Sequence, residues 1–272
     1  MQSFLSGIEI IALPYERTTS YLKGTRFAPD AVIEELSKLD PFDFSLGLNP
    51  FKDTIPIINR PFDGSLTDPL ILQTIGATAV NEAFMADRFP ISIGGEHTVT
   101  LGPVLAARNN GSVGVVQLDA HGDLRNSYEG SKYSHACVMR RIIEMGCPTM
   151  GVGIRAICSD EAQFISENNI KIVHAKTVID NNNWYELLND MPQNIYLTID
   201  MDFFDSADVT ALGTPVAAGP GWDAAVAFIT HLFKTKKVIG ADIVELMPTI
   251  GDAPSIRMAA RLAGLLTHLA LH

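Results

Sequence analysis

The chain has 272 residues, of which 47% are hydrophobic and 19% charged, and its formal net charge is −11. This length and hydrophobic content allow one large α/β domain with a sizeable core. The acidic balance argues against nucleic acid or an anionic membrane as a partner, because both bind clustered Lys and Arg. It is compatible with a small cationic substrate.

The cysteines and the chain start bear on the compartment. Cys137, Cys147 and Cys158 are odd in number and show no C-x-x-C spacing, which indicates a reducing compartment and excludes a thiolate zinc site. The sequence has no basic start followed by an apolar stretch, and no apolar run approaches about 18 residues. We therefore expect a cytoplasmic protein without a membrane span.

Short β-rich runs alternate with longer helical patterns along the chain, which is typical of a parallel sheet covered by helices on both faces. No linker or repeat divides residues 1–272, so a single domain is predicted. Strands are predicted, in chain order, at residues 7–13, 55–58, 89–93, 112–118, 149–154, 171–174, 195–199 and 237–243. Helices are predicted at residues 29–39, 68–86, 98–107, 135–144, 160–167, 183–189, 222–234 and 255–271.

Polar residues follow four of these strands. In open parallel sheets, ligands bind beyond the carboxyl ends of the strands, so polar groups placed there are candidates for a site. The four segments are Gly94-Gly95-Glu96-His97, residues 119–123, residues 200–202 and Glu245.

Two of the four segments carry metal-ligand side chains at alternate positions. Asp119, His121 and Asp123 form one set, and Asp200 and Asp202 form the other. Residues two apart in an extended chain point to the same side, so each set is expected to converge. Four carboxylates aimed at one place repel one another unless a cation lies between them. These four aspartates, together with His121 and His97, form a predicted set of six metal ligands.

The ligand types indicate which metals fit. Carboxylates and imidazoles without thiolate suit Mn²⁺ and also accommodate Zn²⁺, Co²⁺ or Fe²⁺. Two divalent cations balance the charge of four aspartates and lower the pKa of a bridging water from about 15.7 towards 7. Taken alone, Asp200 and Asp202 could cap a helix, and His97 could be a turn residue. The alternating Asp-x-His-x-Asp pattern is what favours a two-metal site.

These motifs resemble those of the ureohydrolases, the arginase and agmatinase family. The resemblance spans about residues 23–260 and rests on six segments in the family's order. They are residues 23–29, 94–97, 119–125, 134–136, 198–202 and 242–248. The resemblance implies a three-layer α/β/α fold with a parallel eight-stranded sheet, usually two Mn²⁺ ions, and a homo-oligomer (trimer or hexamer). One ion would be held by His97, Asp119, Asp123 and Asp200, and the other by Asp119, His121, Asp200 and Asp202.

Within the family, agmatinases are most similar in residues 123–125 and 133–137, which implies cleavage of agmatine to urea and putrescine, as in polyamine biosynthesis. Asp123 would orient the attacking hydroxide. His135 would relay a proton to the leaving amine, since histidine titrates near the working pH; its alternative is a helix-start residue without a chemical role. Glu245 would bind the guanidinium by charge-assisted hydrogen bonds, or else be a structural ion-pair partner.

Some residues depart from the agmatinase pattern. Ser206 and Val216 stand where agmatinases usually have Pro and Glu, in a loop that, by this resemblance, helps to shape the substrate pocket. Asn126 is a further candidate for substrate binding, whereas Arg125 is more simply a structural ion pair. Arginine, guanidinobutyrate and formiminoglutamate therefore stay open as substrates. A binuclear phosphohydrolase and a non-catalytic metal-binding scaffold are the competing classes; the acidic rim disfavours phosphate.

Overall fold

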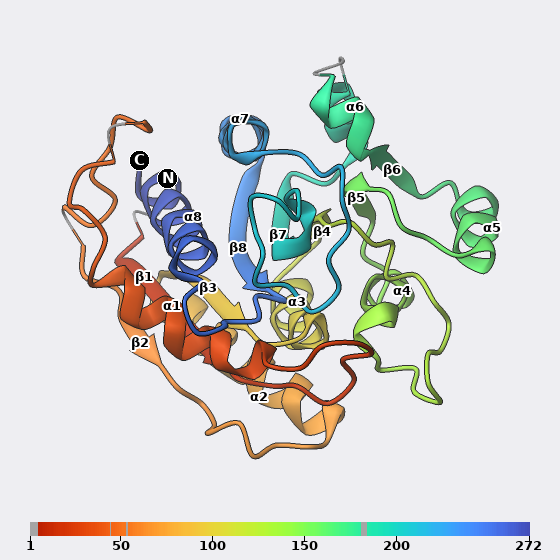
Figure 1. The fold of residues 1–272 in the computed structure, drawn as a ribbon, viewed down its shortest axis with the longest axis horizontal. Coiled ribbons are helices and arrows are strands. Elements are labelled where there is room, and N and C mark those ends of the chain that lie inside the picture. The colour runs from red at the N-terminus through yellow and green to blue at the C-terminus, as the bar shows by residue number, and fades with distance from the viewer. Residues whose placement is uncertain (1–4, 44, 53, 181–183) are drawn as a thin grey trace.

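The described residues of the computed structural model, 5–43, 45–52, 54–180 and 184–272, form one eight-stranded sheet between two layers of helices (Figure 1). Every strand pair is parallel, and the order across the sheet is β2-β1-β3-β8-β7-β4-β5-β6. The strands are β1 Gly7–Leu13, β2 Ile57–Asn59, β3 Arg88–Gly94, β4 Gly114–Leu118, β5 Thr149–Ile154, β6 Lys171–His174, β7 Asn194–Asp200 and β8 Lys237–Val244. The predicted α/β/α class with a parallel sheet is confirmed.

Both faces of the sheet are buried, because successive strand residues point to opposite sides. Ile8 and Ile10 of β1 belong to one hydrophobic core, whereas Ile11 and Leu13 belong to another on the opposite face. This explains why the strands read as continuous apolar runs instead of alternating with polar residues.

The helices divide between the two faces. Residues of α1 (Ala28–Leu36), α7 (Trp222–Thr235) and α8 (Ala253–Leu271) line the first core. Residues of α2 (Pro69–Met85), α3 (Leu101–Asn109) and α4 (Val138–Glu144) line the cores of the other face. The remaining α-helices among the described residues are α5 Ser159–Asn168 and α6 Ala175–Ile179, near the β6 edge (Figure 1). None of the helices described is long and apolar enough to cross a membrane.

Most predicted elements are present, and the differences lie at their ends. The predicted helices at 98–107 and 135–144 begin with 3₁₀ turns, His97–Thr100 and His135–Cys137. The helix predicted at 183–189 starts at residue 183, outside the described residues, and the described part is a 3₁₀ helix, Tyr185–Asp190. Helix α6 was not predicted from the sequence, because its five residues are too few for helical periodicity to be detected.

Candidate metal centre

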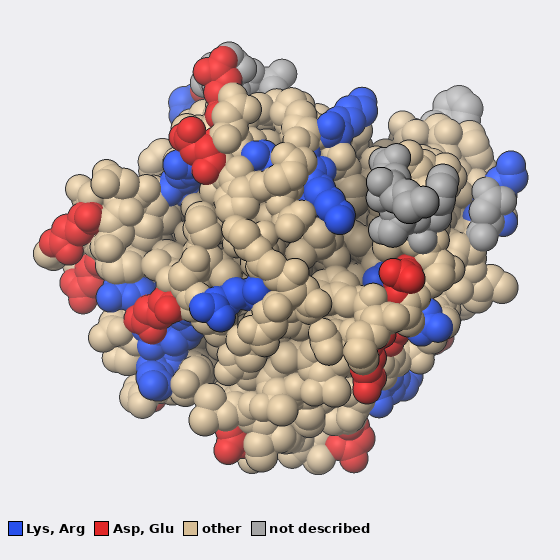
Figure 2. Space-filling model, turned by 180° about the vertical axis from the view of Figure 1, so that it is seen from behind, with Lys and Arg blue, Asp and Glu red and all other residues tan. Residues whose placement is uncertain are grey.

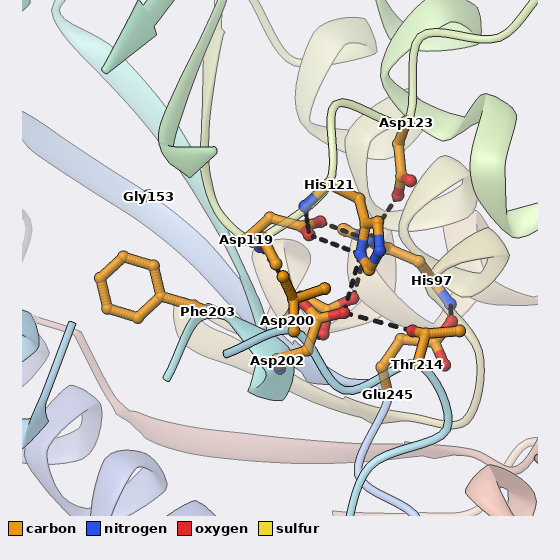
Figure 3. A network of polar contacts seen from close by, with 12 residues as sticks. His97, Asp119, His121, Asp123, Gly153, Asp200, Asp202, Phe203, Thr214 and Glu245 are labelled. Atoms are coloured by element: carbon orange, nitrogen blue, oxygen red, sulfur yellow. Dashed lines mark hydrogen bonds and ion pairs between the residues drawn. The ribbon is translucent and has the colours of Figure 1, made fainter. Parts of the chain in front are cut away.

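The strand order places four carboxyl ends at one rim of the sheet. β3, β8, β7 and β4 are neighbours in the sheet, although they are far apart along the chain. His97 follows β3, Glu245 follows β8, Asp200 ends β7, and Asp119 follows β4. Figure 3 shows these side chains converging on one place, together with His121, Asp123 and Asp202. The structure thus brings all six predicted ligands together.

The first half of the cluster surrounds the imidazole of His97. Its Nδ1 lies 2.9 Å from Asp123 Oδ2, 3.2 Å from Asp119 Oδ2 and 3.4 Å from Asp200 Oδ2. His97 and Asp119 are fully buried, and Asp200 is 3% exposed. Among the described residues, two groups of three His and Asp side chains have ligand atoms that all lie within 4.8 Å of one another, and His97, Asp119 and Asp200 form the first.

The second half surrounds the imidazole of His121. Its Nδ1 lies 2.9 Å from Asp202 Oδ2 and 3.7 Å from Asp119 Oδ1. Asp119, His121 and Asp202 form the second such group, so Asp119 is shared between the two. His121 is the most accessible of these side chains, at 31% exposure, and lines a small cavity of about 220 Å³ with Asp123. The cluster is therefore open to a small molecule on the side of His121.

The donor set fits divalent cations. Two ligands at about 2.1 Å from an ion, at right angles, are about 3 Å apart, which matches the separations around His97 Nδ1. That nitrogen is buried, and none of its contacts with the described residues, including the three carboxylates, has the geometry of a hydrogen bond. Burial and the carboxylates of Asp202 and Asp119 raise the pKa of Asp200 well above its usual value. A bound cation would relieve this repulsion between like charges.

Two buried residues that were not predicted from the sequence contact predicted ligand side chains. Thr198 Oγ1 lies 2.9 Å from His97 Nε2, which leaves Nδ1 facing the carboxylates. Gln117 donates from Nε2 to Asp119 Oδ2 at 2.6 Å. Thr198 stands two positions before Asp200 on β7, and Gln117 stands two positions before Asp119, which directly follows β4. Polar residues at alternate positions in otherwise apolar strands are the sequence signal that could have identified them.

Two further hydrogen bonds hold the Asp202 carboxylate, and a third holds its main chain. Oδ1 accepts a hydrogen bond from the backbone N–H of Ala120 at 3.0 Å. Oδ2 accepts one from the hydroxyl of Thr214 at 3.2 Å, as Figure 3 shows. The backbone N–H of Asp202 itself donates to Asp200 Oδ1 at 2.8 Å. Thr214 was not among the predicted site residues, and it reaches Asp202 only because the loop after β7 folds back over the rim.

Glu245 and His135 lie beside the cluster. Glu245 Oε1 accepts a hydrogen bond from the backbone N–H of His97 at 2.7 Å and lies 3.3 Å from His135 Nδ1. Burial alone would lower the pKa of His135, but the hydrogen bond with Glu245 and its charge raise it to about 9. The backbone N–H of His135 donates to Thr18 Oγ1, and Thr18 in turn donates to the buried Glu96. This network ties the loop after β1 to the site.

Two site residues have left-handed backbone conformations that non-glycine residues rarely adopt. The φ angle is 52° at Asp123 and 61° at Glu245. Such strain persists only where the surrounding structure enforces it, and it is concentrated at functional sites. At Asp123 it ends the extended alternation of the Asp-x-His-x-Asp segment, and the Asp123 carboxylate contacts His97.

Asn126 lies apart from the cluster. It is exposed, and its amide oxygen accepts a hydrogen bond from Arg141 at 3.2 Å. Its role in substrate binding stays a prediction. Arg125 lies in the 220 Å³ cavity, with its Nε 3.9 Å from Glu161 and its guanidinium 4.6 Å from the ring centroid of Tyr128. The interpretation of Arg125 as a structural ion pair agrees with these contacts.

The fold and the cluster define an α/β/α protein with a candidate two-metal centre at the carboxyl rim of its sheet. Comparison with known proteins narrows this class. The model of the Arginase family matches residues 6–268. The N(1)-aminopropylagmatine ureohydrolase of Synechocystis sp. is 41% identical over 266 residues, which cover 95% of this chain and 87% of that protein.

Two further comparisons agree. The agmatinase of Pyrococcus horikoshii is 33% identical over 258 residues, 92% of this chain and 87% of that protein. The crystal structure of the agmatine ureohydrolase of Thermoplasma volcanium superposes with a TM-score of 0.85 at 27% identity, covering 97% of this chain and 89% of that one. The chain belongs to the arginase family. It is an agmatinase-like ureohydrolase, a hydrolase that acts on carbon–nitrogen bonds of linear amidines.

Proposed function

We propose that this enzyme hydrolyses the guanidinium group of agmatine to urea and putrescine, with two Mn²⁺ ions as cofactors. The observation that carries the proposal is the pair of clusters that meet at Asp119, with the Glu245–His135 pair beside them. His97, Asp119, Asp123 and Asp200 would hold one ion, and Asp119, His121, Asp200 and Asp202 the other. Bound cations would supply Lewis acidity and lower the pKa of a water to near neutrality.

The chain's own residues would position the substrate. Among the described residues Glu245 Oε2 has no hydrogen-bond partner, whereas Oε1 is held by His97 and His135. Oε2 can therefore accept an N–H of the substrate's planar guanidinium. Asp123, which is held against His97, would orient the attacking water towards the guanidinium carbon.

His135 would handle the proton. As the carbon–nitrogen bond breaks, the amine leaves only if it takes up a proton, and a protonated imidazole can provide one. The pKa of about 9 keeps His135 protonated at neutral pH, because the charge of Glu245 outweighs the effect of burial. Glu245 would thus both bind the substrate and keep the general acid charged.

The surroundings of the cluster favour a substrate without a carboxylate. Arg125 in the adjoining cavity contacts Glu161 and Tyr128, so its guanidinium is already engaged and is poorly placed to pair with the α-carboxylate of arginine. The apolar side chains of Ala136, Ala156 and Ile157 line the same cavity and suit a methylene chain. Lys and Arg are interspersed with Asp and Glu on the face shown in Figure 2. A surface that binds nucleic acid would instead have its Lys and Arg clustered.

N(1)-aminopropylagmatine is the second candidate substrate. The relative that is 41% identical carries the name N(1)-aminopropylagmatine ureohydrolase, and so does a relative from Thermococcus kodakarensis that is 35% identical. This compound has the same guanidinobutyl end as agmatine, so the cluster and Glu245 would treat the two alike. Discrimination would depend on how the rim receives the extra aminopropyl group.

A urea-release assay with Mn²⁺ tests the proposal. The panel contains agmatine, N(1)-aminopropylagmatine, arginine, guanidinobutyrate and formiminoglutamate, and kcat/KM ranks them. The highest value for agmatine supports the first candidate, and the highest value for the aminopropyl derivative supports the second. Formamide release would indicate the formimino branch. No product from any of the five compounds, with metal bound, would contradict the proposal and favour a metal-binding scaffold.

A further inference from the structure

Arg155 has an unusual set of contacts beside the metal centre. It follows β5 directly and is half-buried. Its side chain makes six hydrogen bonds, and every acceptor is a main-chain carbonyl oxygen. Since a guanidinium has five N–H groups, at least one of them is shared. Among the described residues no carboxylate forms an ion pair with it.

The six acceptors lie on three segments that surround the centre. Nη2 donates to Asp202 at 2.8 Å and to Val216 at 2.7 Å. The other four acceptors are the carbonyls of Gly153, Phe203, Phe204 and Ala217, at 3.0–3.2 Å. The backbone N–H of Arg155 also donates to the carbonyl of Ala120, between Asp119 and His121. One residue therefore joins the segments that carry ligands of the second cluster.

This arrangement fixes Asp202 from both ends. Arg155 holds the main chain at Asp202 itself and at Val216, two residues beyond Thr214. The hydroxyl of Thr214 donates to the Asp202 carboxylate, so the loop that Arg155 holds also orients this side chain. Carboxylate orientation decides whether a ligand set closes around an ion, because metal–oxygen distances tolerate only about 0.2 Å of error.

The charge of Arg155 adds to this effect. Burial lowers its pKa, but the nearby carboxylates of Asp202 and Asp119 act against that change. A fixed cation behind the cluster offsets part of the repulsion among the aspartates. The hydrogen bonds, by contrast, are directional and require the planar shape of the guanidinium, which lysine does not have.

We propose that Arg155 is a positioning residue that sets the geometry of the His121–Asp202 half of the metal centre by binding the main chain of segments 202–204 and 216–217. The proposal rests on the proposed metal centre and is independent of which guanidino substrate the enzyme uses.

The test compares Arg155→Met and Arg155→Lys with Arg261→Met. Arg261 of α8 is a matched control. Its side chain is 30% exposed and donates hydrogen bonds to Asp43 and Ser45, in the loop that follows α1. Titration calorimetry with Mn²⁺ as the probe measures both sites in chelator-treated full-length protein, and circular dichroism checks folding.

We expect Arg155→Met to weaken one of the two Mn²⁺ sites by about 10–100-fold, as losses of residues that support metal ligands generally do. Arg155→Lys retains the charge and should recover only part of the Mn²⁺ affinity. In both Arg155 variants, excess Mn²⁺ should restore kcat, and KM should be unchanged. Arg261→Met should bind Mn²⁺ like the unaltered protein.

Unchanged Mn²⁺ binding in folded Arg155→Met would overturn the inference, as would an equal loss in Arg261→Met. If Arg155→Met does not fold, Arg155→Lys decides, and full affinity in that variant overturns the inference. If the unaltered protein itself binds no Mn²⁺, the proposed metal centre fails and this inference fails with it. Loss of affinity in the Arg155 variants combined with turnover of some other guanidino compound would support the inference and correct only the substrate.

Discussion

Glu245 Oε1 lies 3.3 Å from His135 Nδ1 and at the same time accepts a hydrogen bond from the backbone N–H of His97. One carboxylate oxygen thus joins the proposed general acid to the loop that carries a proposed metal ligand. Because Oε1 is held on both sides, Oε2 has a defined direction and remains available for the substrate.

This contact predicts how activity depends on pH. The pKa of His135 is raised to about 9 by Glu245 against the effect of burial. Since the folded value lies above the usual 6.5, protonated His135 contributes stability that is fully present below about pH 6.5 and is lost as pH rises through about 9. In Glu245→Gln the charge is removed, so the alkaline limb of the kcat–pH profile should move to lower pH. Glu129→Gln, at an exposed position, is the control and should leave the limb in place. A limb that does not move in Glu245→Gln would separate this pair from the proton transfer.

Removal of the imidazole tests its role directly. His135→Ala should reduce kcat by about 10²–10⁴-fold, the usual contribution of general acid–base catalysis. Metal content, measured by mass spectrometry, should not change, because His135 is not in either ligand group. His174→Ala, at an exposed position on β6, should retain full turnover. Turnover of His135→Ala that equals that of the control would exclude His135 from the mechanism.

We expect a substitution at Thr198 to weaken Mn²⁺ binding, although Thr198 itself would not contact the metal. Thr198→Val removes the partner of His97 Nε2 while keeping the volume, so the imidazole loses the contact that orients Nδ1. Mn²⁺ affinity should fall by about 10–100-fold. Thr267→Val is the control, since Thr267 is equally buried and its hydroxyl has no partner among the described residues. Equal Mn²⁺ affinities for the two variants, by titration calorimetry, would show that the Thr198 hydroxyl does not orient His97.

A substitution at Gly153 tests the packing of this residue against Phe203, the neighbour of Asp202 in the chain. Its φ is 90°, and an added Cβ would lie 2.5 Å from the ring of Phe203 and 3.0 Å from the carbonyl oxygen of Asp119. Gly130 has a similar φ of 81° but open space around it. Both Ala substitutions carry the backbone penalty, so the clash alone distinguishes them. Urea unfolding should show Gly153→Ala to be less stable than Gly130→Ala by about 1–3 kcal/mol. Equal free energies of unfolding would mean that Phe203 moves aside without cost.

Local patterns in the sequence predicted much of the fold and of the candidate site. Buried strands appear as continuous apolar runs, and ligand types at alternate positions mark Asp119 with His121 and Asp200 with Asp202. These signals are short-range, since each depends on residues close together in the chain. The apolar runs are present as strands, but the ligand residues lie where the strands end: residues 119–123 follow β4, and Asp202 lies in the 3₁₀ helix Met201–Phe203. The elements that differ, such as α6 and the 3₁₀ starts, are too short for periodicity to be detected.

Only the tertiary structure decided which groups meet. The sheet order places β8 between β3 and β7, so Glu245 reaches the backbone of His97 across 148 residues of chain. The backbone at Asp123 is left-handed and its carboxylate contacts His97, which strand alternation does not predict. Arg155 contacts Asp202 and Val216 through carbonyl groups that every residue possesses, so no residue type in the sequence marks those partners. Side-chain patterns can be read along the chain, whereas contacts to main-chain atoms arise only once distant segments are packed together.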